Sequence, residues 1–268
     1  MIKRLAGTLF AALAISSLAV APAQAVQVQA DFTAIVALNN CSGSVVRPPA
    51  ALDTDPALVM SNGHCVKFMG ANEVIKNQSS SRTFTLLNSA GQSLGTLRAT
   101  KLAYATMKDT DVSFYQVNRT YAQIQQQFGT RALVLSTARP TQGANIQVVS
   151  GFWKRIWSCQ VDGFAFQLKE DVWTWRDSVR YTSTCNTIGG TSGSPVIDTS
   201  SGKVVAINNT GNEDGARCTL NNPCEVSQTG QVTVRQGINY AEEIYNIPAC
   251  IGAGNQFNTS LPGCTLPK

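Results

Sequence analysis

The stretch Gly189-Gly190-Thr191-Ser192-Gly193-Ser194-Pro195-Val196 places one serine, Ser192, among small residues. Small residues on both sides let the chain turn sharply, so two neighbouring backbone N–H groups can point toward one place. Donors from Gly190 and Ser192 would face the negative charge that develops on a carbonyl oxygen during acyl transfer. The alternative is a flexible Gly/Ser loop. The apolar segment Pro195–Ile197 follows immediately and favours a defined turn before a strand.

His64 is the single histidine and lies in Ser61-Asn62-Gly63-His64-Cys65, just after the apolar segment Ala57–Met60. A lone histidine is more often a surface residue or a satisfied core residue than a catalytic one. Here, however, Gly63 permits a closely packed turn, and Cys65 can fasten that turn through a disulfide. A general base must be held in a fixed orientation, so His64 is the candidate base.

Asp111 begins the segment Asp111-Val112-Ser113-Phe114. An acid at the start of an apolar strand can be buried while its backbone is tied into a sheet, which suits a carboxylate that orients an imidazole. An aspartate at a strand end is more often a turn residue, and Asp109 is a rival two positions away. Because Asp109 lies further from the strand, Asp111 is preferred.

Short apolar segments rich in Val, Ile, Thr and Phe recur along the chain and are separated by Gly, Asn, Ser and Pro, a pattern typical of an all-β sandwich or barrel. The expected strands are Thr33–Leu38, Gly43–Val46, Ala57–Ser61, Arg82–Leu87, Leu94–Ala103, Val112–Val117, Asn145–Gly151, Ile156–Phe166, Val179–Ser183, Pro195–Ile197, Lys203–Asn208 and Val232–Arg235. Residues 118–144 divide them into two groups of six. Tyr121–Phe128 is predicted as a short helix or an exposed connector, and Tyr240–Tyr245 as a short helix.

The N-terminus has the pattern of a signal peptide: Lys3 and Arg4, an apolar stretch over Leu5–Val20, and the cleavage motif Ala23-Gln24-Ala25. The alternative is a membrane anchor, against which Pro22 and the small residues near it argue. The predicted organisation is a signal peptide over 1–25, a first barrel over 26–120, a connector over 121–144, a second barrel over 145–247 and a disulfide-fastened tail over 248–268.

Composition and charge exclude several classes of protein. Hydrophobic residues make up 43% of the 268 residues and charged residues 14%, which is too apolar for a disordered chain. Without Lys3 and Arg4 the chain has 19 basic and 16 acidic residues. No Lys/Arg run accompanies this balance, so the sequence predicts neither nucleic-acid binding nor membrane binding after signal removal.

The eight cysteines are Cys41, Cys65, Cys159, Cys185, Cys218, Cys224, Cys250 and Cys264. An even number behind a signal peptide predicts four disulfides in an oxidising compartment, outside the cell or in the periplasm. A zinc site is the alternative, but there is no Cys-x-x-Cys pair and only one histidine. We therefore expect no metal and no cofactor.

Together these segments resemble the trypsin/chymotrypsin-like serine peptidases, and more closely their secreted bacterial branch of glutamyl- and lysyl-endopeptidase type. The chain order His64, Asp111, Ser192 matches that superfamily. Gly-His-Cys resembles its histidine signature, Asp-Val-Ser-Phe its acid signature and Gly-Thr-Ser-Gly-Ser-Pro its serine signature. The resemblance covers roughly residues 33 to 246 and is carried chiefly by the serine and histidine motifs in combination.

The resemblance implies two six-stranded antiparallel Greek-key β-barrels with the active site in the cleft between them, and a short C-terminal helix. His64 and Asp111 would come from the first barrel and Ser192 from the second. The implied activity is that of a secreted, monomeric serine endopeptidase acting on polypeptides. A catalytically inactive homologue that serves as a secreted binding module, and an esterase, remain as alternatives.

Alignment on the serine implies a substrate site. Asn186 would lie at the base of the primary pocket, lined by Thr187, Asn208 and Gln236, and Thr210 and Gly211 would pair with the substrate backbone. No carboxylate stands at the pocket positions, so a neutral polar pocket is expected, and an acidic substrate side chain would fit only if Arg235 turned inward.

Two departures from the family pattern concern Thr191 and Asn209. Thr191 stands where the trypsin branch has an acid that pairs with the freed N-terminus on activation, so that ion pair is not available here. Asn209 stands where the family usually has a serine touching the catalytic acid, and it is expected to donate the same kind of hydrogen bond. By resemblance, the disulfides would join Cys41–Cys65, Cys159–Cys185, Cys218–Cys224 and Cys250–Cys264.

Overall fold

The computed structural model describes Ile2 and residues 27–268, so the predicted signal peptide, Ile2 apart, lies outside the described residues. The strands are β1 (Ile35–Ala37), β2 (Ser42–Arg47), β3 (Pro56–Ser61), β4 (Val74–Ser79), β5 (Thr83–Leu87), β6 (Ser93–Thr106), β7 (Val112–Thr120), β8 (Leu133–Val134), β9 (Asn145–Ser150), β10 (Arg155–Glu170), β11 (Trp173–Tyr181), β12 (Pro195–Asp198), β13 (Val204–Gly211), β14 (Cys224–Val226), β15 (Val232–Val234), β16 (Asn239–Glu243), β17 (Ile251–Gly252) and β18 (Gln256–Phe257). The helices are α1 (Tyr121–Phe128) and two 3-10 turns, η1 (Ile247–Cys250) and η2 (Ala253–Asn255).

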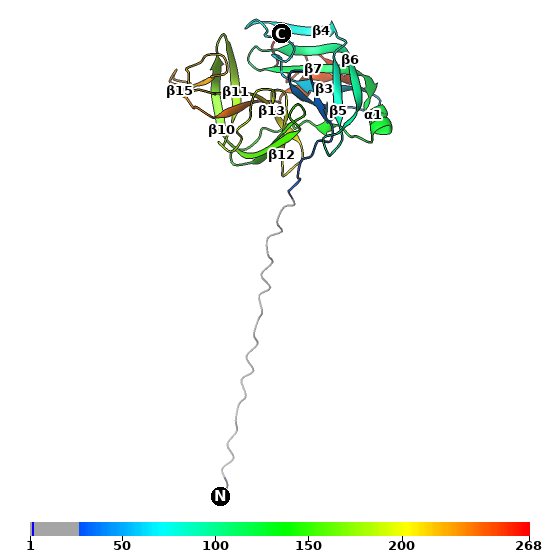
Figure 1. Ribbon diagram of the computed structural model, residues 1–268, viewed down its shortest axis with the longest axis horizontal. Helices are drawn as coiled ribbons and strands as arrows, with labels where there is room; N and C mark the ends of the chain where they lie inside the picture. The colour runs from blue at the N-terminus through cyan, green and yellow to red at the C-terminus, as the bar shows by residue number, and fades with distance from the viewer. Residues whose placement is uncertain (1, 3–26) are drawn as a thin grey trace.

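The strands form two closed antiparallel rings, which lie side by side in Figure 1. The first ring runs β1-β5-β6-β7-β3-β2 and closes through β1–β2. The second runs β11-β16-β13-β12-β9-β10 and closes through β10–β11. The six strands of each ring can be numbered in chain order. In both rings the first strand then pairs with the second and the fourth, and the sixth strand pairs with the third and the fifth. This shared Greek-key order confirms the predicted pair of six-stranded barrels.

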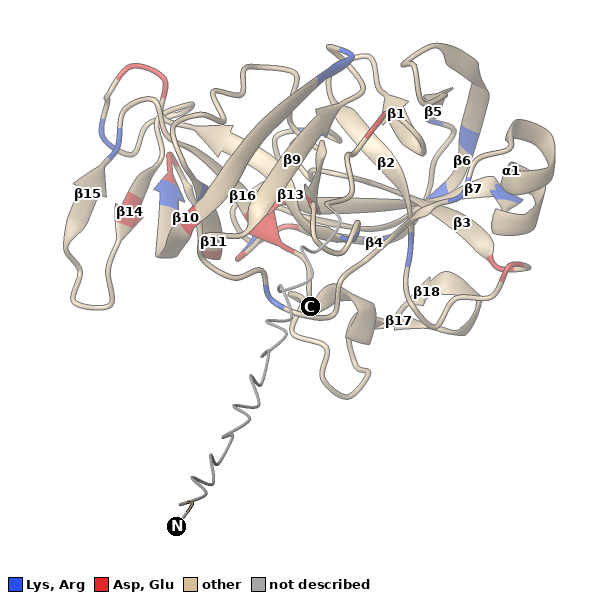
Figure 2. Cartoon of the chain, turned by 90° about the horizontal axis from the view of Figure 1, so that it is seen from below, with Lys and Arg blue, Asp and Glu red and all other residues tan. Residues whose placement is uncertain are grey.

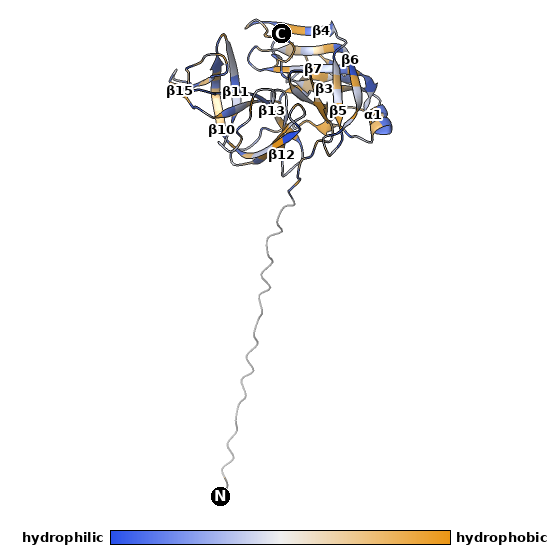
Figure 3. Cartoon of the chain, in the orientation of Figure 1, coloured by the Kyte–Doolittle hydropathy of each residue, from blue (hydrophilic) through white to orange (hydrophobic). Residues whose placement is uncertain are grey.

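Each barrel surrounds its own apolar core. Side chains from β1, β3, β5 and β7 fill the first, and the second is filled from β9, β10, β12 and β16. Figure 3 shows the hydrophobic residues concentrated on the strands, whereas α1 is mostly hydrophilic and buries only Tyr121 and Ile124. Lys and Arg of the described residues are spread over both barrels (Figure 2).

The segment Tyr121–Phe128, for which the sequence left a helix and a connector open, is the helix α1. A capping box explains where it begins: the Thr120 hydroxyl accepts from the N–H of Gln123, and the Gln123 side chain accepts from the N–H of Thr120. Gly129 ends the helix with a φ of 65°, a left-handed conformation that glycine adopts without strain.

The prediction of a helix over Tyr240–Tyr245 is wrong, because residues 239–243 form β16, the sixth strand of the second ring. Every residue of β16 is buried, so the strand lacks the alternation of polar and apolar residues that marks a half-exposed strand. The predicted strand at Val232–Arg235 is instead β15, which pairs with β14 outside the ring. The short helix near the C-terminus is the 3-10 turn η1.

The C-terminal segment packs back on the first barrel, and Figure 1 shows the C-terminus beside β4. The side-chain amide of Gln116 donates to the carbonyls of Gly254 and Asn255 at 3.0 and 2.9 Å. The Tyr104 hydroxyl donates to the carbonyl of Pro267 at 2.9 Å. The eight cysteines form the four expected disulfides.

The hairpin β10–β11 joins the barrels by reaching across to the first one. The buried indoles of Trp173 and Trp175 donate to the carbonyls of Met69 and Met107 at 2.9 and 3.1 Å. Both indole rings belong to the apolar core of the first barrel. These contacts attach the hairpin of the second barrel to the first barrel.

Candidate active site

A cleft of about 300 Å³ lies between the barrels. His64 and Asp111 line it from the first barrel, and Gly190, Ser192 and Thr210 line it from the second. The three residues expected as a triad therefore face one cavity, although they are far apart in the sequence.

His64 and Asp111 are joined by two hydrogen bonds. The Nδ1 atom of His64 lies 2.7 Å from Oδ2 of Asp111, and the main-chain N–H of His64 donates to Oδ1 at 3.1 Å. A Cβ on Gly63 would overlap the carbonyl of Thr106 and lie 3.0 Å from Oδ1 of Asp111. Only glycine therefore fits at position 63, next to Thr106 and Asp111. A larger residue at this position would crowd the carboxylate that contacts the ring.

Asp111 is fully buried at the start of β7, as its position before the apolar strand predicted. The side-chain amide of Asn62 donates to its main-chain carbonyl at 2.7 Å, and the Ser113 hydroxyl donates to the carbonyl of Asn62 at 2.8 Å. Asp109, the rival, instead has a 41% exposed side chain and pairs with Arg176 at 3.0 Å. It takes no part in the contact with His64.

The environment of His64 raises the pKa of its imidazole above the ordinary value of 6.5. Burial opposes protonation and has the largest single effect, but it is outweighed by the Asp111 carboxylate, through its charge and its hydrogen bond, with a further contribution from Glu170. The raised pKa makes the imidazole of His64 a better proton acceptor than a free histidine.

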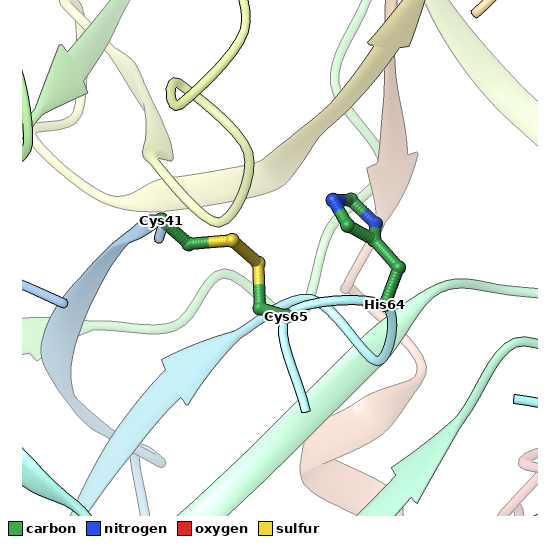
Figure 4. A group of neighbouring side chains, drawn as sticks. All are labelled: Cys41, His64 and Cys65. Carbon is green, nitrogen blue, oxygen red and sulfur yellow. A yellow bond between two sulfur atoms is a disulfide. The ribbon is translucent and has the colours of Figure 1, made fainter. Parts of the chain in front are cut away.

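The Cys41–Cys65 disulfide lies beside His64 (Figure 4) and ties the turn that carries the imidazole to the segment before β2. The two sulfurs and the imidazole are close enough to suggest a metal site, but both sulfurs are consumed in the disulfide. A disulfide offers no thiolate to a metal ion, so this cluster is a structural brace.

The turn around Ser192 depends on two glycines in the left-handed region. Gly190 has a φ of 87° and Gly193 a φ of 81°. A Cβ on Gly193 would overlap the carbonyl of Ser42 and the hydroxyl of Ser61. The carbonyl of Ser192 accepts from the N–H of Ser42 at 2.8 Å, and the N–H of Gly193 donates to the carbonyl of Asn208 at 3.0 Å. The turn is therefore fixed rather than flexible.

Two donors at this turn remain free. Within the part of the chain that the structure describes, neither the N–H of Gly190 nor that of Ser192 donates a hydrogen bond to another residue. The hydroxyl of Ser192 donates to the carbonyl of Asn209 at 3.3 Å rather than to the imidazole. Hydrogen bonds at reacting groups are commonly long or misaligned in ligand-free enzymes.

The expected contact of Asn209 with Asp111 is wrong. Its side-chain amide donates instead to Oε1 of Glu242 at 3.0 Å, on the strand β16 that pairs with β13. Burial raises the pKa of Glu242 to about 8, the hydrogen bond from Asn209 opposes the shift, and nearby Asp111 adds to it. Glu242 was not predicted as a neighbour of the site, because residues 240–245 were expected to form a helix and not a strand of the ring.

The residues expected at the substrate site divide into two groups. Thr187, Asn208, Thr210 and Gly211 line the cleft. Asn186 and Gln236 are exposed and lie outside its lining. The side chains of Cys185 and Thr187 are buried, and successive side chains of an extended chain point to opposite sides, so Asn186 points outward.

Arg235 does not turn inward, because its guanidinium donates to Glu225 at 3.0 Å. The cleft residues that the sequence did not predict include Asn239 on β16 and Glu170 at the end of β10. Glu170 accepts from the Thr210 hydroxyl at 2.6 Å and from the N–H of Asn221 at 2.9 Å. Burial raises the pKa of its carboxyl, and these two hydrogen bonds oppose that shift. A buried acid that ends a long strand is the signal that could have drawn attention to it.

Comparison with known proteins agrees with this geometry. Residues 41–207 match the family model described as "Trypsin-like peptidase domain". Because the match covers more than half of the chain, the protein belongs to the trypsin-like peptidase family. The expected family resemblance is thereby confirmed.

Solved structures share the fold at low sequence identity. The active form of the Rv3671c protease from M. tuberculosis aligns over 96% of this chain and 97% of its own, with a TM-score of 0.50 and 13% identity. The MamO protease domain from Magnetospirillum magneticum aligns over 80% and 94%, with a TM-score of 0.50 and 12% identity. A search among curated proteins found no match.

Proposed function

We propose that the protein is a secreted serine endopeptidase that hydrolyses peptide bonds through an acyl-enzyme, with His64, Asp111 and Ser192 as its triad. The observation that carries the proposal is the 2.7 Å contact between Nδ1 of His64 and the fully buried carboxylate of Asp111, in a cleft that Ser192 also lines. That contact leaves the other ring nitrogen to serve as the base.

In the proposed mechanism, Oγ of Ser192 attacks the carbonyl carbon of the scissile peptide while Nε2 of His64 takes the hydroxyl proton. The carbonyl oxygen becomes an oxyanion that accepts hydrogen bonds from the N–H groups of Gly190 and Ser192. The imidazolium then protonates the leaving nitrogen, the C–N bond breaks and an ester with Ser192 remains. A water molecule, deprotonated by His64, attacks this ester, and as the ester C–O bond breaks the imidazolium of His64 returns the proton to Oγ of Ser192.

The strand β13 supports a peptide as the substrate. Thr210 and Gly211 lie at its end, line the cleft and are half-buried, so an extended chain can lie alongside them and pair with the β13 backbone. In this proposal the residues 26–120 and 145–247 are the two barrels and 121–144 connects them. We propose that the enzyme acts as a monomer on polypeptides.

Secretion is proposed from the sequence of residues 1–25 together with the four disulfides, which persist in oxidising compartments. No helix within residues 27–268 has the length and apolar character needed to cross a membrane.

Digestion of a diverse peptide library by the secreted chain tests the proposal, with Ser192→Ala as the control. We expect cleavage inside the peptides by the first protein and none by the second. Hydrolysis of simple esters without peptide cleavage would favour an esterase. Silence of a correctly folded wild-type chain toward both substrates would overturn the proposal in favour of a binding module, and equal cleavage by both chains would refute Ser192 as the nucleophile.

A further inference from the structure

Two chain segments form the walls of the cleft next to Ser192. One is the segment 187–192 that leads to the nucleophile, with Cys185 just before it, and the other is the end of β13. The substrate side chain that precedes the scissile bond must enter between these walls if β13 pairs with the substrate backbone. What lies between the walls therefore limits the size of that side chain.

Asn239 occupies the space between them. It is directly opposite Gly211 in the β13–β16 pair, and the side chains of opposed residues project from the same face of a sheet. A Cβ on Gly211 would overlap Oδ1 of Asn239 and lie 2.8 Å from its Cγ. The carboxamide of Asn239 thus fills the space that a side chain at position 211 would occupy.

The same carboxamide reaches the opposite wall. Its Oδ1 accepts from the Thr187 hydroxyl at 2.8 Å, and its Nδ2 donates to the carbonyl of Cys185 at 3.1 Å. The Cys159–Cys185 disulfide holds that wall in place. Asn239 therefore bridges the cleft from one wall to the other, and a substrate side chain cannot pass beyond it.

The groups around this bridge are neutral and already paired. The Asn208 amide donates to the Thr191 hydroxyl at 3.1 Å, and the Thr191 hydroxyl donates to the carbonyl of Ile188 at 2.5 Å. Thr187, Asn208 and Asn239 are each at least 90% buried. A charged substrate group that reached this floor would lose its hydration against neutral groups that are already paired, which is strongly unfavourable. The carboxylates of the cleft, Glu170 and Glu213, are not among the hydrogen-bond partners of Asn239, which are Thr187 and Cys185.

We infer that Asn239 closes the primary pocket, so that the enzyme cleaves after small, uncharged side chains such as those of glycine, alanine, serine and threonine. This inference rests on the proposed function. It extends the expectation of a neutral pocket by setting the pocket's depth, and it replaces Asn186 with Asn239 as the residue that governs specificity.

The first test uses peptides that differ only in the residue before the scissile bond. The wild-type chain should cleave after alanine with a kcat/KM at least about tenfold higher than after leucine or phenylalanine. Tenfold is about the lower end of what a single methylene group contributes in a hydrophobic pocket. Cleavage mainly after large, acidic or basic residues would overturn the inference but leave the proposed function standing. Silence toward every peptide would overturn both.

The second test opens the pocket with Asn239→Ala. We expect the ratio of kcat/KM for leucine to that for alanine to rise by about tenfold or more. The matched control is Asn186→Ala, which removes the exposed asparagine outside the cleft lining and should leave the ratio unchanged. A folded, active Asn239→Ala chain with the wild-type ratio, or a shifted ratio in Asn186→Ala, would overturn the inference.

A readout without catalysis is a double-mutant cycle at Gly211 and Asn239. Gly211→Ala should lower Tm in the wild-type chain, because the new Cβ overlaps the Asn239 carboxamide. In the Asn239→Ala background the same change should lower Tm much less, since the overlapping group is gone. Equal losses in both backgrounds would show that Asn239 does not occupy the space against Gly211.

Discussion

The indole N–H of Trp153 donates a 2.7 Å hydrogen bond to the main-chain carbonyl of Gly189. In a trans peptide the carbonyl and the following N–H point in opposite directions, so this bond turns the N–H of Gly190 away from Trp153. A Cβ on Gly190 would lie 2.9 Å from the ring of Phe152 and 3.1 Å from Trp153 Nε1, so both aromatic residues pack against the turn. Trp153 is thus a positioning residue for one of the two donors proposed to bind the oxyanion.

Trp153→Phe removes the indole donor and keeps an aromatic ring. We expect kcat to fall toward the hundredfold to about thousandfold loss that removal of one oxyanion donor causes, with little change in KM. Affinity for a peptide boronate, which forms a tetrahedral adduct with the nucleophile, should fall in parallel with kcat/KM.

The control for that change is Trp157→Phe. Trp157 is a buried indole whose N–H has no acceptor among the described residues. Its replacement removes packing and should lower Tm, but it breaks no hydrogen bond and should cause no selective loss of kcat. Unchanged kcat and boronate affinity in Trp153→Phe would refute the positioning role.

Asp111→Asn should lower kcat by about 10⁴-fold, because an amide cannot hold the imidazole in the tautomer that leaves its other nitrogen free to accept a proton. Steady-state kinetics on one peptide measure the change. Asp109→Asn is the matched control, and it should retain wild-type kcat because Asp109 pairs with Arg176 and not with His64. A comparable loss in both variants would argue against Asp111 as the orienting acid.

Glu170→Gln should move the acidic limb of the pH dependence of kcat/KM to lower pH. The Glu170 charge helps to raise the pKa of His64. Its removal lowers that pKa, so His64 stays neutral and able to accept a proton in more acidic solution. Glu213→Gln, which alters another carboxylate of the same cleft, should leave the limb in place. A shift of the Glu170→Gln limb to higher pH would contradict this account.

Glu242 should make the folded protein less stable as the pH rises. Its pKa is raised from 4.5 to about 8 in the folded state, where Asp111, Glu243 and Tyr181 surround it. Between these values the unfolded chain releases a proton that the folded chain keeps, so the free energy of unfolding falls by up to about 1.4 kcal/mol per pH unit. Glu242→Gln removes this dependence.

Thermal unfolding of wild type and Glu242→Gln from about pH 5 to pH 8 checks that prediction. The two Tm curves should diverge as the pH rises, with the wild type losing more. Parallel curves would mean that the carboxyl of Glu242 is already ionised in the folded protein.

Local patterns in the sequence predicted most of the strands and the three motifs, whereas the pair of Greek-key barrels and the disulfide pairing were expected from the family resemblance that these motifs carry. The strands and turns could be predicted because apolar β-formers and Gly/Asn/Ser breakers act within a few residues of one another. Gly63 and Gly193 could be placed at turns from the sequence, but the groups that a side chain there would overlap, the carbonyls of Thr106 and Ser42, lie far along the chain and were not predicted. Asp111 was found because it directly precedes a buried strand.

Only the folded chain revealed the depth of the pocket and the partners of the site. Asn239, Glu242 and Trp153 act on Gly211, Asn209 and Gly189 across separations of 28, 33 and 36 residues. Such contacts depend on which strands become neighbours when each ring closes, and β16 carries two of the three residues without any alternation to mark it as a strand. Barrel closure is a property of the whole chain, so the short-range patterns that predicted each strand could not predict the side chains it would meet.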